Sequence, residues 1–452
     1  MSFPAYPGYK HSGVELLGEL PEHWTLKRFK NVFEERAERS ADGLEELLSV
    51  SAYFGIKPRS ESRDEGDHLS RAESLEGYKV CHPGDLVINI MLAWNRGLGF
   101  SWQSGIVSPA YCVFHVTDGS SPKFLDYLVR SDECIRYFKT HSAGIMDSRL
   151  RLYPESFGRL FTAIPPTCEQ TQIARFLDHE TARIDALIEK QQRLIELLKE
   201  KRQAVISHAV TKGLDPMVPM KDSGVEWLGE VPAHWDVARV KNVAKLESGH
   251  TPSKDFPEYW EGGDIPWVSL NDSKKLKIVD YIEETQFMIT ELGVSNSSAR
   301  LLPARAVVFT RDASIGLAAI TTKKMCVSQH LIAWICNESL VLPEYLLLVF
   351  YAMEQELDRF TFGATIKTIG MPDIRKLLTT VPPLVEQTQI VADLNVKREL
   401  IERLIQESNT ALTLHSERRS ALISAAVTGK IDVRGWQPPA SAPIPELAQE
   451  AV

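Results

Sequence analysis

The chain has 452 residues, of which 44% are hydrophobic and 25% charged; this composition is ordinary for a globular protein, and the length fits roughly two to four domains. The formal net charge of −9 argues mildly against a free-standing nucleic-acid binder, although local Lys and Arg clusters remain compatible with one. The start of the sequence shows no secretory signal, and no apolar stretch is long enough to cross a bilayer. We therefore expect a cytoplasmic protein without a membrane contact.

An internal repeat organises the chain. Residues 10–24 read KHSGVELLGELPEHW and residues 221–235 read KDSGVEWLGEVPAHW, with eleven of fifteen positions identical. A second pair, residues 164–215 and 381–432, has 21 of 52 positions identical. The two inserts between these segments, about 140 residues each, show little similarity to each other. A repeated frame with different inserts indicates one scaffold that presents two different surfaces.

The predicted elements follow the same order twice along the chain. Each insert is predicted to be α/β or α+β, with strand-like runs such as Asp85–Met91 in the first and Ala306–Thr310 in the second. Each insert is followed by a Pro-Pro pair and a long helix, Thr167–Val210 and then Leu384–Val427. In the first helix Thr167 and Gln170 fit a capping box. Gly213 and Gly429 stand where the two helices are expected to end, and the Pro/Ala-rich tail is expected to be disordered.

Each helix carries a single apolar stripe, so the two are expected to bury these stripes on each other as an antiparallel coiled coil. The expected fold class is α+β, with two globular mixed α/β domains separated by two long paired helices in a pseudo-twofold repeat. The predicted interface residues are Ile173, Leu177, Ile184, Leu187, Leu194, Leu198 and Val205 in the first helix, and Ile390, Leu394, Ile401, Leu404, Ala411 and Leu422 in the second. Polar residues interrupt both stripes at corresponding places, Gln191 with Ser408 and Lys201 with Arg418. They are interpreted as ordinary imperfections of the pattern, or alternatively as a register lock or a docking point.

The motifs of the obvious catalytic classes are missing from the sequence. There is no Asn-Pro-Pro or Asp-Pro-Pro motif with a glycine-rich turn for DNA methylation, no GxxxxGK[ST] loop for ATP, and neither GxSxG nor HExxH. The six cysteines are scattered, with no CxxC pair and no histidine cluster at metal-ligand spacing. A non-catalytic protein without a metal site and with reduced thiols is therefore expected.

The combination of repeat and inserts resembles one known family. The LPEHW and VPAHW segments, the helix starts PPTCEQTQIA and PPLVEQTQIV, and the insert motifs GYKVCHPGDLVINIM, GIVSPAYCVF, SGHTPSKDFPEYWEGGDIPWVSL and VVFTRDASIG are similar to specificity subunits of type I restriction-modification enzymes. The resemblance covers residues 10–432. It implies target-recognition domain 1 in residues 1–165, a spacer helix in 166–215, target-recognition domain 2 in 216–383, a second spacer helix in 384–432 and a disordered tail in 433–452.

The resemblance implies a non-catalytic subunit that recognises a bipartite, gapped site in double-stranded DNA. It also implies two methyltransferase subunits docked on the helices and restriction (motor-nuclease) subunits that join them. S-adenosylmethionine, ATP and Mg²⁺ would be bound by those partners, and no cofactor by this chain. A helix of some forty residues is about 60 Å long, whereas ten base pairs span about 34 Å. Two readers held that far apart are expected to bind separated half-sites.

Base readout needs Arg, Lys, Asn or Gln at groove-facing tips, and Ser, Thr and Lys commonly hold phosphates. The candidate DNA-binding residues are Lys57, Arg59, Arg63, Asn95, Arg96, Arg149 and Arg151 in the first insert, and Ser253, Lys254, Ser269, Asn271, Arg311, Thr365 and Lys367 in the second. Core packing is the favoured interpretation for three aromatic residues, Tyr111, Trp260 and Trp267. Packing and capping at a domain edge is the favoured interpretation for His23 and His234.

Two alternatives are compatible with the same sequence. One keeps the fold and changes the partners: a specificity subunit of a type IIB-like system, or a stand-alone DNA-binding regulator. The other is a structural coiled-coil adaptor whose inserts bind proteins.

Overall fold

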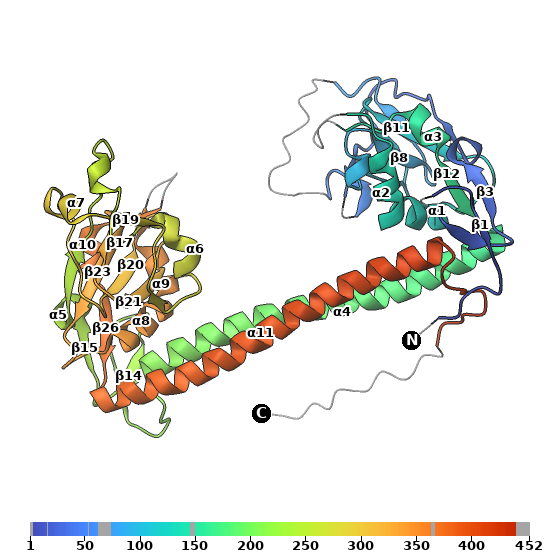
Figure 1. Ribbon diagram of the computed structural model, residues 1–452. Coiled ribbons are helices and arrows are strands. Elements are labelled where there is room, and N and C mark those ends of the chain that lie inside the picture. Colours follow the sequence, from blue (N-terminus) through green and yellow to red (C-terminus); the bar gives the residue numbers. More distant parts are fainter. Residues whose placement is uncertain are drawn as a thin grey trace. The chain divides into compact units, whose positions relative to one another are not determined.

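The computed structural model describes residues 3–15, 17–52, 54–61, 74–144, 150–362 and 367–439. The chain forms two compact units: unit 1 combines Met1–Gln191 with Thr410–Val452, and unit 2 is Gln192–Asn409. Each unit contains one sheet-based domain and part of each of the two long helices, α4 (Thr167–Lys212) and α11 (Leu384–Val427) (Figure 1).

The domain of unit 1 is built on a four-stranded antiparallel sheet. Its strand order is β4 (Phe33–Glu35), β11 (Tyr111–Val116), β8 (Leu86–Asn89) and β9 (Leu98–Phe100). Four two-stranded antiparallel pairs surround it: β1 (Tyr9–His11) with β2 (Glu19–Pro21), β3 (Thr25–Arg28) with β12 (Phe161–Ile164), β5 (Leu48–Ser51) with β6 (Gly55–Pro58), and β7 (Lys79–Cys81) with β10 (Gly105–Val107). The short helices are α1 (Pro122–Val129), α2 (Asp132–Thr140), α3 (Pro154–Arg159), η1 (Phe29–Asn31) and η2 (Ala93–Asn95).

The domain of unit 2 is built on a five-stranded sheet and a three-stranded one. The first has the order β16 (Ala244–Ser248), β23 (Leu331–Cys336), β20 (Val307–Thr310), β21 (Ala318–Thr321) and β18 (Tyr281–Ile282); the second has the order β19 (Phe287–Ile289), β17 (Ile265–Val268) and β22 (Cys326–Val327). The two-stranded pairs are β13 (Met220–Asp222) with β14 (Glu230–Pro232), β15 (Asp236–Arg239) with β26 (Leu378–Val381), and β24 (Thr361–Phe362) with β25 (Thr368–Ile369). The short helices are α5 (Val240–Val243), α6 (Ser273–Leu276), α7 (Glu291–Ser295), α8 (Pro343–Ala352), α9 (Glu354–Arg359), α10 (Met371–Ile374), η4 (Pro257–Tyr259) and η5 (Leu270–Asp272).

The two dissimilar inserts share one strand plan. The order β4-β11-β8-β9 of unit 1 corresponds to the order β16-β23-β20-β21 of unit 2, with antiparallel pairing throughout these four positions. Unit 2 adds β18, which is parallel to β21. The predicted strand runs in both inserts are confirmed as β8 and β20, the two central strands that occupy the same place in this plan. The repeat therefore extends into segments where sequence similarity is low.

The long helices pack in antiparallel fashion, as predicted. In unit 1 the start of α4 lies beside the end of α11, where the Arg419 Nε lies 2.8 Å from an oxygen of Asp185. In unit 2 the end of α4 lies beside the start of α11, where Arg202 pairs with Glu402 at 3.0 Å. Both helices end at glycines with positive φ, Gly213 at 78° and Gly429 at 74°, which confirms the predicted stops.

The predicted apolar stripe is correct at some positions and one residue off at others. Leu187, Leu194 and Leu404 are 45%, 42% and 40% exposed, so these three predicted interface residues are wrong. The neighbouring Ile195 and Ile405 are buried instead. The error has a simple cause, because leucines on both sides of the seam give two overlapping apolar series and helical spacing alone does not choose between them.

The remaining predicted interface residues fall into two groups. Ile184 and Ile401 are buried, and Leu198, Val205, Ala411 and Leu422 are half-buried. Ile173 and Leu177 belong to the hydrophobic core of unit 1, and Ile390 and Leu394 to that of unit 2. These four residues therefore fix the first turns of each helix to its domain core.

The polar residues that interrupt the predicted stripes also divide. Ser408 is buried and Gln191 half-buried, whereas Lys201 and Arg418 are exposed. The first two lie among the seam positions and the last two outside them. A role in register therefore concerns only Gln191 and Ser408, and a role in docking only Lys201 and Arg418.

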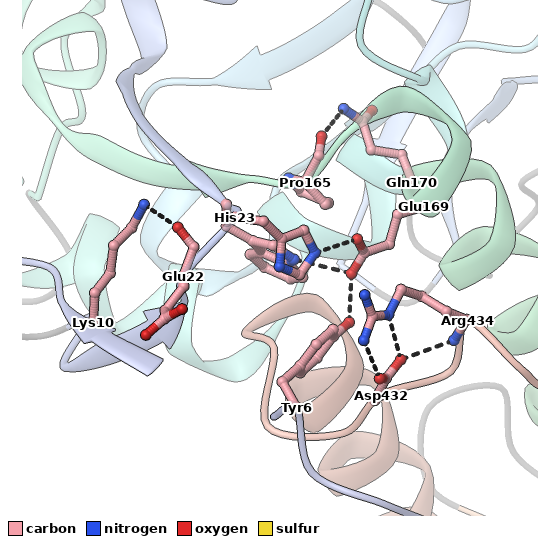
Figure 2. A network of polar contacts seen from close by, with 10 residues as sticks. Tyr6, Lys10, Glu22, His23, Pro165, Glu169, Gln170, Asp432 and Arg434 are labelled. Carbon is pink, nitrogen blue, oxygen red and sulfur yellow. Dashed lines mark hydrogen bonds and ion pairs between the residues drawn. The ribbon is translucent and has the colours of Figure 1, made fainter. Parts of the chain in front are cut away.

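A repeated polar junction ties each helix start to its domain, and Figure 2 shows the one at the start of α4. In unit 1 the buried Glu169 accepts hydrogen bonds from the Tyr6 hydroxyl (2.5 Å) and the Trp24 Nε1 (2.9 Å), and its second oxygen lies 2.6 Å from the His23 Nε2. In unit 2 Glu386 holds Trp235 Nε1 at 2.8 Å and His234 Nε2 at 2.7 Å. These contacts explain why the His-Trp and Glu-Gln pairs recur in the sequence.

The glutamine of the same motif binds the domain rather than the helix. The Gln170 Nε2 donates to the Pro165 carbonyl (2.9 Å), and its Oε1 accepts from the Ser121 N–H (2.7 Å) just before α1. Gln387 makes the matching bonds to the Pro382 carbonyl and the Leu342 N–H. The predicted capping box of Thr167 and Gln170 is therefore wrong, because the glutamine is used to anchor a neighbouring helix.

An ion pair clamps α11 onto the sheet of unit 2. Arg398 donates to both oxygens of Asp280 at 2.8 Å and stacks over the Tyr351 ring, 5.3 Å from its centroid. Burial raises the pKa of the Asp280 carboxyl, but the hydrogen bonds and charge of Arg398 outweigh it and hold this pKa below its ordinary value.

The predicted disordered tail begins too early. Val433 is fully buried, and Trp436 packs edge-on against Phe176 of α4 with ring centroids 5.2 Å apart. The Gln172 amide donates to the carbonyls of both Val433 and Trp436. Residues 433–436 are thus part of unit 1, and residues 440–452 lie outside the described residues.

Membrane spans and metal clusters are both absent from the described ranges. No helix there is both long and apolar enough to serve as a membrane span, and no group of three His, Cys, Asp or Glu residues lies together there as a metal site would require.

Candidate nucleic-acid interface

One end of the unit 2 domain gathers the loops that carry the predicted DNA-binding residues. Strands β16, β17, β20 and β22 end there, and β23 and β25 begin there. We define the unit 2 loop end as residues 249–254, 269–272, 311–316, 328–330 and 367–368.

Backbone hydrogen bonds join these loops into one surface. The Ser328 N–H donates to the Val268 carbonyl at 2.9 Å, and the His250 N–H donates to the Val327 carbonyl at 3.0 Å. The Ala313 N–H donates to the Lys367 carbonyl at 2.8 Å. Residues more than 100 positions apart in the sequence therefore form a single candidate site.

Four of the seven predicted residues in the second insert are exposed at this loop end. They are Ser253, Lys254, Asn271 and Lys367. A fifth, Thr365, lies outside the described residues. The exposed hydroxyl, ammonium and amide groups are of the kinds that contact phosphates and base edges.

The other two predicted residues have structural roles in this conformation. Ser269 is 3% exposed, and its hydroxyl caps η5 by accepting from the Asn271 N–H, while Asp272 accepts from the Ser269 N–H. The Arg311 guanidinium donates to the carbonyls of Gln329 (3.2 Å) and Ile369 (3.4 Å). Arg311 thus holds two loops together.

Sequence reasoning missed residues between β22 and β23. Gln329 is exposed and its side chain accepts a hydrogen bond from the Thr251 hydroxyl. The Nδ1 of the neighbouring His330 lies 2.7 Å from a carboxylate oxygen of Asp312, which is itself buried. The signal was present in the sequence, since the Val-Ser of GIVSPAYCVF recurs as Val327-Ser328 before this pair.

Trp260 and Trp267 of the second insert support the packing interpretation. Trp267 is 5% exposed and its ring lies edge-on to that of Trp260, with centroids 5.1 Å apart. Their Nε1 atoms donate to the carbonyls of His250 and Ser253, respectively. Both residues shape the loop that contains Thr251.

Unit 1 has a loop end in the corresponding place. The Leu152 N–H donates to the Ile90 carbonyl, as the Ile369 N–H does to the Arg311 carbonyl in unit 2. The Tyr111 N–H donates to the Ser108 carbonyl, as the Leu331 N–H does to the Ser328 carbonyl. We define the unit 1 loop end as residues 54–59, 90–96, 108–110 and 151.

Most predicted residues of the first insert lie on the unit 1 loop end. Lys57 is exposed on β6, with its ammonium 5.0 Å from the centroid of the Phe54 ring, and Arg59 follows it. Asn95 and Arg151 are exposed. Arg63 and Arg149 lie outside the described residues.

The Arg96 side chain makes contacts within the domain and is not directed to solvent as a ligand-binding group would be. Its backbone has a positive φ of 63°, and its guanidinium donates to the Arg130 carbonyl (2.6 Å) and pairs with Asp132. The Arg130 side chain reaches the Ala52 carbonyl of the β5–β6 hairpin at 3.5 Å. Arg96 therefore links the hairpin that carries Lys57 to the turn that carries Asn95.

A basic hollow of about 360 Å³ lies along β16 of unit 2. It is lined by Lys241, Arg300 and Arg375 together with Ser248, whose successor Gly249 begins the loop end. The buried Glu247 balances part of this charge, because one oxygen lies 3.2 Å from Arg300 and the other 2.6 Å from Lys245. Three cations beside a loop surface form a suitable environment for a phosphate group.

Comparison with known proteins finds one matching family model and two solved structures with a similar fold. Residues 232–410 match the family model of the type I restriction modification DNA specificity domain. A solved chain from a study of complex assembly and conformational transition of the type I R-M system has a TM-score of 0.68 at 18% identity, over 90% of this chain and 98% of that one. The HsdS subunit from Thermoanaerobacter tengcongensis has a TM-score of 0.54 at 17% identity, over 91% and 98%. These structures share the fold of two mixed sheet domains and two paired long helices.

Curated relatives carry the same description. The MjaIX specificity subunit of Methanocaldococcus jannaschii is 30% identical over 39% of this chain and 40% of its own length, and the EcoR124I/EcoR124II specificity subunit of Escherichia coli is 28% identical over 49% and 50%. The chain thus spans half or less of these two relatives. The MjaVIII specificity subunit matches at 22% identity over 77% of this chain and 81% of its length. The chain is thus similar to type I restriction-modification specificity subunits in sequence, and it shares the fold of two solved structures of this kind.

Proposed function

We propose that this chain is the DNA specificity subunit of a type I restriction-modification system and reads a bipartite, gapped site in double-stranded DNA. The observation that carries the proposal is the single strand plan that presents different side chains at equivalent loop ends. One loop end offers Lys57, Asn95 and Arg151, and the other offers Lys254, Gln329 and Lys367. Two readers with different side chains recognise two different half-sites.

The proposed division of the chain follows from this arrangement. Residues 1–165 and 216–383 are the two target-recognition domains, and 166–215 and 384–432 are the spacer helices. The 46-residue helix α4 is about 69 Å long at the standard rise. We propose that a helix of this length lets the chain read half-sites more than one turn of duplex apart, a turn being about 34 Å.

Charge at the unit 2 loop end supports DNA as the ligand despite the overall net charge of −9. The basic hollow of Lys241, Arg300 and Arg375 lies beside the loops. Phosphate contacts position a protein on the duplex, and base contacts specify the sequence. In this proposal the hollow holds the backbone while the loop tips face the base edges.

The helices supply a surface for protein partners. Leu194 and Leu197 on α4 and Leu400 and Leu404 on α11 are 40–53% exposed, although the seam beside them is buried. We propose that methyltransferase subunits, two per chain, cover these leucines and that restriction (motor-nuclease) subunits join them. S-adenosylmethionine, ATP and Mg²⁺ would be bound by those partners in the cytoplasm, and no cofactor by this chain.

The test is methylation mapping of DNA from cells that produce this chain with its cognate type I methyltransferase subunit. We expect methylated bases confined to one sequence with two defined halves and an undefined gap. Omitting this chain should abolish the signal. Methylation of a contiguous site would contradict the gapped reading, and a complex that neither binds nor methylates DNA would favour the adaptor alternative.

A further inference from the structure

The loop between β22 and β23 differs in chemistry between the two units. In unit 2 it reads Ser328-Gln329-His330, and in unit 1 the loop between β10 and β11 reads Ser108-Pro109-Ala110. The frame around both loops is the same, since each begins after a strand that ends in valine and is closed by an N–H bond to the serine carbonyl. Pro109 and Ala110 have no side-chain donor or acceptor, whereas Gln329 and His330 have both.

The amide of Gln329 is held in one orientation. The Thr251 hydroxyl donates to the side-chain Oε1 of Gln329. The main-chain carbonyl of Gln329 accepts a hydrogen bond from the Arg311 Nε at 3.2 Å, which holds the backbone of the loop. The hydrogen bond from Thr251 uses one lone pair of Oε1. The other lone pair and both Nε2 protons have no hydrogen-bond partner among the described residues, so they are available to a ligand. An exposed amide with one acceptor and one donor side by side matches the N6 and N7 edge of adenine in the major groove.

His330 is fixed beside it by a buried carboxylate. Asp312 is 6% exposed, and one oxygen lies 2.7 Å from the His330 Nδ1. Because that contact places the Nδ1 proton toward Asp312, the Nε2 is the ring nitrogen that remains for a ligand. The other Asp312 oxygen and the Ser328 hydroxyl are buried without a hydrogen-bond partner among the described residues. Polar groups with unused capacity thus lie directly behind this loop.

We infer that Gln329 is a specificity-determining residue of the second domain and reads an adenine at one position of its half-site, with Thr251 as a positioning residue. The inference rests on the proposed function and goes beyond it by assigning one base to one side chain. We also infer that the first domain contacts bases through loops other than Ser108–Ala110, because the Pro109 and Ala110 side chains have no hydrogen-bonding group.

The experiment compares the methylomes produced by complexes of the full chain with its methyltransferase subunit. Gln329→Ala should reduce the preference for adenine at one position of one half-site by about tenfold, with the other half-site unchanged. Gln329→Glu should shift the preference at that position toward cytosine, because a carboxylate accepts from the cytosine N4 amino group. Thr251→Val should weaken the same preference by freeing the amide to flip.

Two matched controls separate readout from general binding. Lys323→Ala, at an exposed position of unit 2 outside its loop end, should change no base preference. Lys241→Ala, in the basic hollow, should weaken binding to all sites evenly and reduce the salt dependence of binding to DNA carrying the mapped site.

The outcomes distinguish the inference from the proposal beneath it. If the wild-type complex methylates a gapped site and Gln329→Ala leaves every position unchanged, the inference is overturned and the proposed function stands. The inference is also overturned if Gln329→Ala changes both half-sites alike or abolishes methylation everywhere. If the wild-type complex methylates no gapped site, the proposed function itself fails.

Discussion

At the scale of single residues, the repeated polar junction makes the repeat in the sequence intelligible. Glu169 and Glu386 occupy equivalent places, but their surroundings differ. The Glu169 side chain is 3% exposed and has three partners, whereas the Glu386 side chain is 35% exposed and has two. A buried acceptor that loses its charge leaves its donors poorly satisfied, which costs about 1–3 kcal/mol for each group left without a partner.

We therefore expect Glu169→Gln to destabilise the protein by about 2 kcal/mol. Glu386→Gln should have a smaller effect, because water can replace lost contacts at an exposed group. Urea unfolding followed by tryptophan fluorescence measures both, since Trp24 and Trp235 lie at the two junctions. Equal losses for the two variants would contradict this account of the junction.

At the scale of elements, the paired helices depend on which of two overlapping apolar series is buried. Ile195 is 7% exposed and the adjacent Leu194 is 42% exposed. Burial of a side chain of this size stabilises by roughly 1.5–3 kcal/mol, so only the series that contains Ile195 can hold the helices together. Leu194 is left for the proposed partner surface.

Ile195→Ala should lower the free energy of unfolding by about 2–4 kcal/mol, and Leu194→Ala by less than about 1 kcal/mol. The two variants are matched, because each replaces an aliphatic side chain of the same size by alanine at adjacent positions of α4. Thermal unfolding measures the difference. Co-purification with the methyltransferase subunit should show the reverse order, with Leu194→Ala binding more weakly than Ile195→Ala. A larger loss of stability for Leu194→Ala than for Ile195→Ala would contradict the burial of Ile195 between the helices.

At the scale of the whole molecule, α4 and α11 each contribute residues to both units. Four residues of helix add about 6 Å, close to two base pairs of duplex. Under the proposed function, a change in helix length alters the gap between the two half-sites without altering either loop end.

Inserting four residues near Gln191 should lengthen the gap of the recognised site and leave both half-site sequences unchanged. Methylome sequencing of cells with the inserted and the wild-type chain measures gap and half-sites together. Replacing four residues near Gln191 without changing helix length should leave the gap as it is. Altered half-sites with an unaltered gap would show that the helices do not set the spacing.

Much of this protein could be predicted from the sequence alone. The identities between the two halves predicted two long helices and two inserts. They did so because the repeated residues act locally, at the start and at the end of each helix. The Glu-Gln pair binds the domain, and Gly213 and Gly429 end the helices. The strand runs around β8 and β20 were also predictable, since a buried strand requires a short continuous run of apolar residues.

Only the tertiary structure decided the rest. It placed Ile195 rather than Leu194 in the seam, gave Ser269 and Arg311 structural roles, and brought Thr251 and Gln329 together from loops 78 residues apart. It also showed that two inserts with little similarity share one strand order. The physical reason is that sequence periodicity specifies which residues lie on a common face, whereas long-range pairing decides which face is buried and which loops meet.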